Sequence, residues 1–510
     1  MKGATGVAVA VAFVVGPASA GMRETDPLKQ TPLDRYVATP DSNFKWTELP
    51  NSSFAGPGYS AYALNMTSQR WLKRSDFVAD VDRSLWWHFI VIIRPNKLEI
   101  TDKAMMYITG GSNLEKAPPK SPTDEEIAMI GIIAVEARAM ACVLYQIPNQ
   151  PISFAEERPT PKARTEDAMI AWTWKHFHDH PDEVGSAEWL ARLPMTKAAV
   201  RAMDAVEAAV ARREGHTIRQ WAVAGASKRG WTTWTTAAVD DRVMGFAPLV
   251  LDALNLTANL HHMYRAYGGW TFALKDYYAL NFTAQIDDAA TREMFAIVDG
   301  YTYIERFASL PKFVVNACGD EFLQMDDDHY WWDALKGEKH RLIIQDAEHS
   351  LATGLEQVVP SLCSFITALF RGLPRPSIRW ELGATATGNS ITVHTSEQPT
   401  HVRVWHADTL QDERRDWRLI TGLDPCPWIK VKGLCVQPVL WHESEPKQLS
   451  STSWIAAFDP PAKGWRAYNV EVEFAGPTLF HYKYNTQVNV VPETFPYPAC
   501  RGEGCKGKLL

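Results

Sequence analysis

Short apolar runs alternate with amphipathic stretches over most of the first 370 residues. The apolar runs have the length and residue types of buried strands, and the stretches between them repeat apolar residues at helical spacing. Such alternation predicts a mostly parallel sheet with helices on both faces. The expected strands are 59–72, 87–93, 104–108, 142–145, 218–224, 243–250, 312–317 and 341–345, and the expected helices are 123–138, 166–178, 196–213, 228–239 and 355–370. Thr123 and Glu126 are predicted to form a capping box on the first of these helices.

The alternation breaks between residues 255 and 307, where the sequence is aromatic and helical in character. Because this insertion interrupts the succession of strands, we expect it to lie over the carboxyl edge of the sheet. Two arrangements fit the pattern equally well, a mobile lid and a fixed, packed layer of helices.

A different pattern follows the hinge-like sequence Gly-Leu-Pro-Arg-Pro at 372–376. Short alternating strands replace helices, which predicts a small β-sandwich. The expected strands are 377–382, 390–395, 401–407, 453–458, 467–474 and 479–489. The predicted organisation is therefore a main domain over 21–372, a β-rich domain over 377–492 and a tail over 493–510.

The first twenty residues have the pattern of a secretory signal peptide. Lys2 provides a positive start, residues 7–15 are apolar, and Ala18-Ser19-Ala20 is a small-residue cleavage pattern. An uncleaved anchor is the alternative, but about thirteen apolar or small residues are short for a bilayer span. We therefore expect a secreted protein that begins near Gly21 and is not inserted in a membrane.

Composition and charge narrow the class of protein. A length of 510 residues predicts two or three domains. The net charge of −7 and the lack of a Lys/Arg tract argue against a nucleic-acid partner. Four sequons are candidate glycosylation sites, although such triplets also arise by chance in a long chain. They begin at Asn51, Asn65, Asn255 and Asn281.

The seven cysteines fall into two groups. In an oxidising compartment, those in loop-like segments are expected to form the disulfides Cys426–Cys435 and Cys500–Cys505. The others lie in apolar segments and are expected to be buried thiols: Cys142, Cys318 and Cys363.

Ser227 is the leading candidate for a nucleophile. It lies in the turn GASKRG at 225–230, between a predicted strand and a predicted helix. Glycines there relieve crowding, so that a serine can hold a strained conformation with its hydroxyl exposed. Arg229 occupies the second glycine position of the G-x-S-x-G pattern, and Gly230 is expected to take over its packing role. On this motif alone, a nucleophile and a helix-capping serine fit equally well.

Candidate partners follow in the chain order that an α/β-hydrolase triad requires. Asp320 follows the strand 312–317, where the acid belongs, and His349 follows the strand 341–345, where the base belongs. Competing acids and bases are close in sequence: Glu321, Asp326, Asp327, Asp328, His329 and His340. The last acidic run could also suggest a metal site, but no matching ligand spacing exists elsewhere, so no metal or cofactor is expected.

Backbone amides are expected to form the oxyanion hole, from Lys228 and from the loop at Gly110 and Gly111. The side chains of Lys228 and Arg229 have two possible roles. Either side chain can pair with acidic neighbours or face solvent, as charges in a first helical turn usually do. The alternative is that Lys228 favours an anionic substrate or adds to oxyanion stabilisation, and that Arg229 contributes to substrate binding.

Several stretches together resemble the PhoPQ-activated pathogenicity-related protein family, whose eukaryotic members include the autocrine proliferation repressor proteins. They are TPLDRYV at 31–37, FKW at 44–46, ITGG at 108–111, GASKRGWT at 225–232, GDEF at 319–322 and AEHS at 347–350. The resemblance implies an α/β-hydrolase fold with a Ser–Asp–His site, and it names no substrate. The SKRG turn is also similar to that of glucuronoyl esterases, which points to an anionic substrate.

Two functions are therefore expected as alternatives. The first is a secreted serine hydrolase that acts on an ester or a peptide or amide bond of a small-molecule substrate, through Ser227, His349 and Asp320. The second is an extracellular signal of the proliferation-repressor type, which binds a cell-surface receptor and has little or no turnover.

Overall fold

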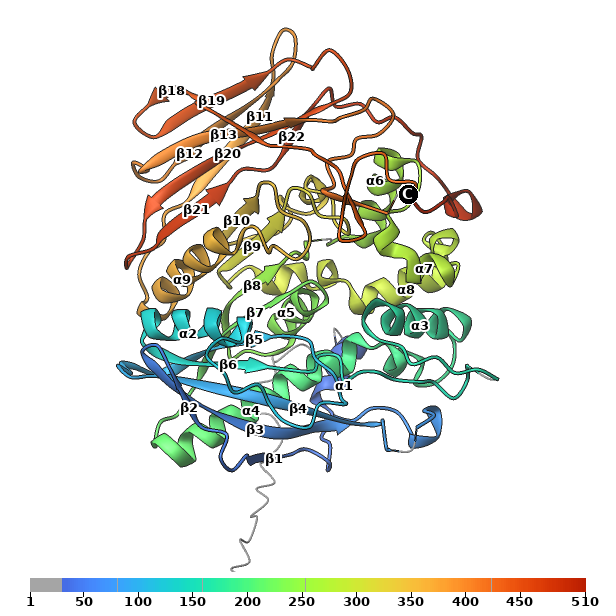
Figure 1. Cartoon of the computed structure of the whole chain (residues 1–510), viewed down its shortest axis with the longest axis vertical. Helices are drawn as coiled ribbons and strands as arrows, with labels where there is room; N and C mark the ends of the chain where they lie inside the picture. Colours follow the sequence, from blue (N-terminus) through green and yellow to red (C-terminus); the bar gives the residue numbers. More distant parts are fainter. Residues whose placement is uncertain (1–29, 80, 158, 253, 423) are drawn as a thin grey trace, which may run out of the picture.

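A ten-stranded sheet forms the centre of the computed structural model, which describes residues 30–510 except 80, 158, 253 and 423 (Figure 1). The signal peptide predicted over 1–20 lies outside the described residues. The strand order is β1-β3-β4-β6-β5-β7-β8-β9-β10, with β2 paired to β3. The bounds are β1 (Lys45–Glu48), β2 (Phe54–Gly56), β3 (Tyr59–Arg70), β4 (Leu85–Pro95), β5 (Ile100–Ile108), β6 (Ala139–Leu144), β7 (Gln220–Ala226), β8 (Val243–Leu249), β9 (Lys312–Ala317) and β10 (Lys339–Ile344).

Strands β5 to β10 form a parallel block, and β1 to β4 extend it with antiparallel pairing. Alternate residues of β7 point into different cores, with Trp221 in one and Ala222 in the other. Helices α2 (Glu125–Ala137) and α9 (Leu355–Arg371) cover one face, and α4 (Arg192–Glu214) and α5 (Lys228–Val239) cover the other. The predicted α/β-hydrolase fold is confirmed.

The predicted capping box at the start of α2 is wrong. Asp124 is the N-cap, and its side chain accepts a hydrogen bond from the backbone N–H of Ile127. Glu126 instead accepts a hydrogen bond from the Thr109 hydroxyl at 2.8 Å, because its side chain points back to the end of β5.

The insertion at 255–307 forms a packed layer of short helices. Its aromatic side chains meet Trp174 of α3 (Glu166–Asp179), with ring centroids 5.0 Å away for both Tyr277 and Phe282 and 5.6 Å away for Phe295. The elements are α6 (Leu256–Tyr267), η4 (Phe272–Leu274), α7 (Lys275–Ala279), η5 (Phe282–Gln285), α8 (Ala289–Val298) and η6 (Gly300–Phe307). The remaining helical elements are α1 (Pro32–Ala38), η2 (Arg74–Asp76), η3 (Ser186–Trp189), η7 (Asp327–Tyr330) and η8 (Gly502–Cys505).

Additional antiparallel sheets follow α9 and lie at the top of Figure 1. Two of them share a core, to which Val393 and Val470 contribute, as in a sandwich. One sheet contains β11 (Ile378–Ala384), β12 (Asn389–Thr395), β18 (Lys447–Ser450) and β19 (Ser453–Phe458), and the other β13 (His401–Asp408), β17 (His442–Ser444), β20 (Arg466–Ala475), β21 (His481–Asn485) and β22 (Asn489–Val491). The single strand predicted over 479–489 is thus two strands.

A third small sheet was not predicted. It contains β14 (Ile420–Thr421), β15 (Ile429–Val431) and β16 (Leu434–Val436), whose strands are too short to give a clear alternating pattern. The disulfide Cys426–Cys435 fixes this sheet. Both predicted disulfides are confirmed, and so are the buried thiols of Cys142, Cys318 and Cys363.

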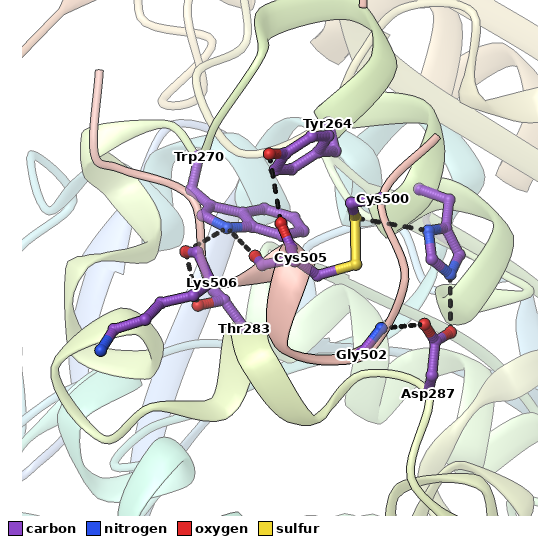
Figure 2. Close-up of a disulfide and its surroundings, with 10 residues drawn as sticks. Tyr264, Trp270, Thr283, Asp287, Cys500, Gly502, Cys505 and Lys506 are labelled. Atoms are coloured by element: carbon purple, nitrogen blue, oxygen red, sulfur yellow. Dashed lines mark hydrogen bonds and ion pairs between the residues drawn. A yellow bond between two sulfur atoms is a disulfide. The ribbon is translucent and has the colours of Figure 1, made fainter. Parts of the chain in front are cut away.

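Residues 500–510 lie against the helical insertion (Figure 2). The indole N–H of Trp270 donates to the carbonyl oxygens of Cys505 and Lys506 at 2.8 and 3.0 Å, and the Thr283 hydroxyl donates to the latter at 3.2 Å. The Gly502 N–H donates to the Asp287 carboxylate at 2.9 Å. We call this segment, with its disulfide Cys500–Cys505, the C-terminal strap, because it ties several parts of the insertion together.

Candidate active site

Ser227 lies in a strained turn between β7 and α5. Its φ of 57° and ψ of −128° are rare for a residue with a side chain, and its N–H donates to the carbonyl oxygen of Leu249 at 2.8 Å. A Cβ atom on Gly225 would come within 2.8 Å of the carbonyl oxygen of Arg229, and one on Gly230 within 2.8 Å of that of Leu249. Gly230 therefore allows the close approach of helix and strand that the second glycine of the motif normally provides.

The structure brings Ser227, His349 and Asp320 together in a chain of hydrogen bonds. The Asp320 carboxylate accepts a hydrogen bond from His349 Nδ1 at 2.7 Å. A carboxylate only accepts, so this bond assigns the ring proton to Nδ1 and leaves Nε2 to accept from the hydroxyl of Ser227, also at 2.7 Å. These are the contacts that a nucleophile, a base and an orienting acid require.

Backbone and aromatic contacts fix the acid and the base. Asp320 Oδ1 accepts hydrogen bonds from the N–H groups of Phe322 at 2.7 Å and Leu323 at 3.1 Å. The Phe322 ring lies 4.5 Å from the imidazole of His349. The carboxylate and the imidazole are therefore held in place before any substrate binds.

The competing acids and bases have other partners. Asp326 binds His262 at 2.9 Å and also Arg415, and Asp328 pairs with Arg341. His329 bonds the carbonyl oxygen of Val488 at 2.8 Å, and His340 pairs with Glu338 at 2.9 Å. The remaining two competitors lie closer to the site: Asp327 lines the adjacent cavity, and the Glu321 carboxylate accepts the backbone N–H of His349 at 3.2 Å. Among the described residues, none of the six competing side chains has a hydrogen bond to Ser227.

The electrostatics of the site favour protonation of both the imidazole and a neighbouring carboxyl. Burial opposes the charged form of His349, but the Asp320 carboxylate outweighs it, so the pKa of His349 lies above its ordinary value of 6.5. Burial, with the charge of Asp320, raises the pKa of Glu321 to about 7. The positive charge of Lys228 acts to lower the pKa of His349.

Two backbone segments could bind an oxyanion, as the sequence predicts. The N–H of Lys228 is the first of α5, where the positive end of the helix dipole lies. Gly110 and Gly111 follow β5, whose last residue Ile108 pairs with Gly225. Within the described part of the chain, the N–H groups of these two glycines have no hydrogen-bond acceptor. Their role in an oxyanion hole stays a prediction.

The side chains of Lys228 and Arg229 are already paired. Lys228 Nζ lies 3.0 Å from the carboxylate of Glu166 and 3.1 Å from that of Asp167, and Arg229 Nη2 lies 2.6 Å from Glu166. Burial raises the pKa of Glu166, but the two cations outweigh it and hold that pKa at about 2. The first of the two predicted roles, pairing with acidic neighbours, describes both side chains.

A cavity of about 110 Å³ opens beside Ser227 and His349, between α3, α5 and the helical insertion. Its wall is mainly apolar, and its aromatic members are Trp174, Trp231, Tyr277, Phe282, Phe295 and Phe322. Arg192, at the start of α4, also lines it. Arg192 was not predicted from the sequence, because the apolar pattern places the beginning of this helix at residue 196.

One cluster outside the cavity wall has donors that suit a metal ion. Glu156, His176 and His180 have ligand atoms within 4.8 Å of one another. Contacts with Glu156 account for this geometry: its carboxylate is hydrogen-bonded to His176 Nδ1 at 2.8 Å and forms an ion-pair contact with His180 Nε2 at 3.3 Å.

The candidate glycosylation sites differ in exposure. Asn51 and Asn281 are exposed, whereas Asn65 is half-buried within β3 and Asn255 is half-buried, with its amide donating to the carbonyl oxygen of Tyr330. No helix among the described residues is both long enough and apolar enough to cross a membrane.

Comparison with solved structures returns esterases of low similarity. Acetyl xylan esterase 1 from Thermoanaerobacterium sp. JW/SL YS485 is 11% identical with a TM-score of 0.41, over 66% of this chain and 92% of the esterase. The acetyl xylan esterase from Paenibacillus sp. R4 is 12% identical with a TM-score of 0.44, over 68% of this chain and 96% of the other.

Sequence comparison is more decisive. Autocrine proliferation repressor protein A of Dictyostelium discoideum is 33% identical over 494 residues, which cover 94% of each chain. The profile of the family described as PhoPQ-activated pathogenicity-related protein matches residues 33–418, which include Ser227, Asp320 and His349. The chain therefore belongs to the PhoPQ-activated pathogenicity-related protein family.

Proposed function

We propose that this protein is a serine hydrolase that cleaves an ester or amide bond through an acyl-enzyme on Ser227. The proposal is carried by one observation, the pair of 2.7 Å contacts that join Ser227 to His349 and His349 to Asp320 beside a cavity. The strained turn and the α/β-hydrolase scaffold support it further, because they suit an exposed nucleophile.

In the proposed reaction, Ser227 Oγ attacks the substrate carbonyl carbon while its proton passes to His349 Nε2. The oxyanion is bound by the N–H of Lys228 and by the Gly110–Gly111 loop. His349 then donates the proton to the leaving oxygen or nitrogen as its bond to the carbonyl carbon breaks. Water, deprotonated by His349, then attacks the acyl carbon. The bond from this carbon to Ser227 Oγ breaks as His349 returns the proton to Oγ, and the acid is released. Asp320 remains ionised and stabilises the imidazolium.

The reaction is proposed to take place outside the cell. Two disulfides support this location, since they persist in oxidising compartments. The signal peptide that the sequence predicts over residues 1–20 would lead to the same location.

Labelling with a fluorophosphonate serine probe tests the proposed nucleophile. We expect the purified protein to be labelled at neutral pH, and Ser227→Ala to abolish the label. Ser350→Ala is the matched control, because Ser350 is an exposed serine next to His349 whose hydroxyl is bound by Glu348; it should label like the parent protein. Absence of Ser227-dependent labelling would overturn the hydrolase proposal.

A second candidate function is extracellular signalling on the same scaffold. It is favoured by the relative named autocrine proliferation repressor protein A, at 33% identity over nearly the whole chain. Adding the protein and its Ser227→Ala variant to growing cells separates the two functions. Equal growth inhibition by both would support receptor binding without turnover, and loss of inhibition in the variant would support the hydrolase.

A further inference from the structure

Arg192 is a buried cation without an ion pair. It is 3% exposed, and no carboxylate among the described residues lies within 4.0 Å of its guanidinium. Nη1 donates to the carbonyl oxygen of Lys228 at 2.6 Å and to the hydroxyl of Thr232 at 3.1 Å, and the guanidinium stacks 4.3 Å from the ring centre of Trp231. Burying a guanidinium without a counter-charge is costly, and burial accordingly lowers its pKa to about 9.

One edge of this guanidinium is free. Nε is buried with no hydrogen-bond partner, and in the described part of the protein Nη2 has none either. Nη2 is the nitrogen that an anion in the cavity could reach, because Nε is shielded and does not face the cavity. Since Arg192 lines the cavity beside Ser227, an anion bound in that cavity could supply the missing partner.

Asp327 also lines the cavity, but burial raises the pKa of its carboxyl well above the ordinary value. The other charged side chains beside the cavity are already paired. Asp167 accepts from Lys228 at 3.1 Å and from the hydroxyl of Tyr277 at 3.2 Å. Lys228 and Arg229 are in turn neutralised by Glu166 and Asp167. The basic residues that follow the nucleophile in sequence are therefore occupied, and the unoccupied cation is the one on α4.

We propose that the cavity binds a short apolar acyl group that ends in a carboxylate, and that Arg192 binds this carboxylate. The apolar wall suits the carbon chain, and a site of this kind normally combines such a wall with a few polar groups that fix orientation. A dry cavity of about 150 Å³ accommodates benzene, so the 110 Å³ here suits a short chain of about four carbons. The inference rests on the proposed hydrolase function and names its substrate class.

Turnover of matched esters tests this substrate class. The probes are the mono-p-nitrophenyl esters of succinate, glutarate and adipate, each compared with the neutral p-nitrophenyl ester of equal chain length. We expect kcat/KM to favour the carboxylated ester by about tenfold or more for at least one length, as for a hydrogen bond to a buried charge. Arg192→Met should remove this preference.

The ratio of the two kcat/KM values separates binding from folding. Arg192 also holds the first turn of α5, so its loss could lower both rates, but a purely structural effect would leave the ratio unchanged. Lys197→Met is the matched control, because it removes another buried cation of α4 that does not line the cavity and donates to the carbonyl oxygen of Thr39. It should keep the ratio of the parent protein. A preference for neutral esters, or an unchanged ratio in Arg192→Met, would overturn the proposal.

Binding without turnover makes the inference independent of the proposed chemistry. Calorimetric titration of the Ser227→Ala protein with monomethyl glutarate and with methyl pentanoate should show about tenfold tighter binding of the anion. Adding Arg192→Met should abolish the difference. If the anion binds selectively but the parent protein shows no turnover, the hydrolase proposal fails and the proposed carboxylate site stands. If the parent protein turns over esters without preferring the anion, the hydrolase proposal stands and the carboxylate site fails.

Discussion

The triad and the cavity wall are built in different ways. Ser227, Asp320 and His349 each follow a strand of the parallel block, and hydrogen bonds from nearby strand ends and loops hold each of them. Most of the aromatic side chains of the wall come from α3 and the insertion and pack against one another, and the C-terminal strap bonds Thr283 of the same wall. This difference indicates that the sheet determines the proposed chemistry, whereas long-range packing determines what reaches it.

Removing the charge of the acid should have the largest effect. Asp320→Asn removes the acceptor that fixes the His349 tautomer, and kcat for a reactive ester should fall by about 10⁴-fold. Glu321→Gln is the control: its side chain still accepts the backbone N–H of His349, so kcat should change by no more than a few fold. An Asp320→Asn enzyme within tenfold of the parent would contradict the assigned role.

The pH dependence should report the same acid. The base must be neutral, so kcat/KM should rise with pH through the pKa of His349, with a midpoint above 6.5. In any residual activity of Asp320→Asn the midpoint should fall, because the main group that raises this pKa is lost. A parent midpoint below 6.5 would show that burial outweighs the carboxylate.

Changing the wall should alter selectivity rather than chemistry. Phe282→Ala enlarges the cavity, and the kcat/KM ratio of an ester longer by a few carbons to a short one should rise by roughly tenfold. Phe365→Ala is the matched control, since this phenylalanine is buried in the core on the other face of the sheet. Its cost in stability should be similar, about 3–5 kcal/mol, without a change in the ratio. If Phe282→Ala and Phe365→Ala gave the same kcat/KM ratio of the longer to the short ester, the wall would not determine selectivity.

Opening the strap should have the smallest effect on turnover. Replacing Cys500 and Cys505 by serine should lower the free energy of unfolding by about 2 kcal/mol, as expected for a short loop. Acyl-chain selectivity should relax by about two- to threefold, on the same scale as a small change in an apolar pocket. The corresponding Cys426/Cys435 variant should lose similar stability and keep the parent selectivity. Denaturant unfolding would measure the stability of each variant, and ester kinetics its acyl-chain selectivity. An identical change in selectivity in the two variants would argue against a role of the strap.

The sequence predicted the parts of the site that depend on local pattern. A run such as 312–317 followed by Gly319-Asp320 indicates both a strand and the position of an acid at its end, so Asp320 and His349 could be found without coordinates. The core strands and helices were predicted for the same reason, with ends that differ by a few residues.

The missed features depend on contacts between distant segments. Nothing near Lys228 in sequence shows that Glu166 and Asp167 pair with it. Arg192 looks like a residue before a helix, and its burial arises only when α4 packs against α5. The hypothesis that the residues next to the nucleophile select an anion was therefore based on Lys228 and Arg229. The unpaired cation, Arg192, could not be recognised from the sequence.

The C-terminal strap also has a consequence for the order of events during synthesis. All three triad residues leave the ribosome well before Cys500–Leu510, which bonds Thr283 of the cavity wall and Trp270 of the helical insertion. Domains fold as they emerge, so a nascent chain can form its sheet and position its nucleophile before the C-terminal strap bonds the cavity wall. Ribosome-stalled intermediates would therefore acquire reactivity toward a serine probe before they acquire discrimination between substrates.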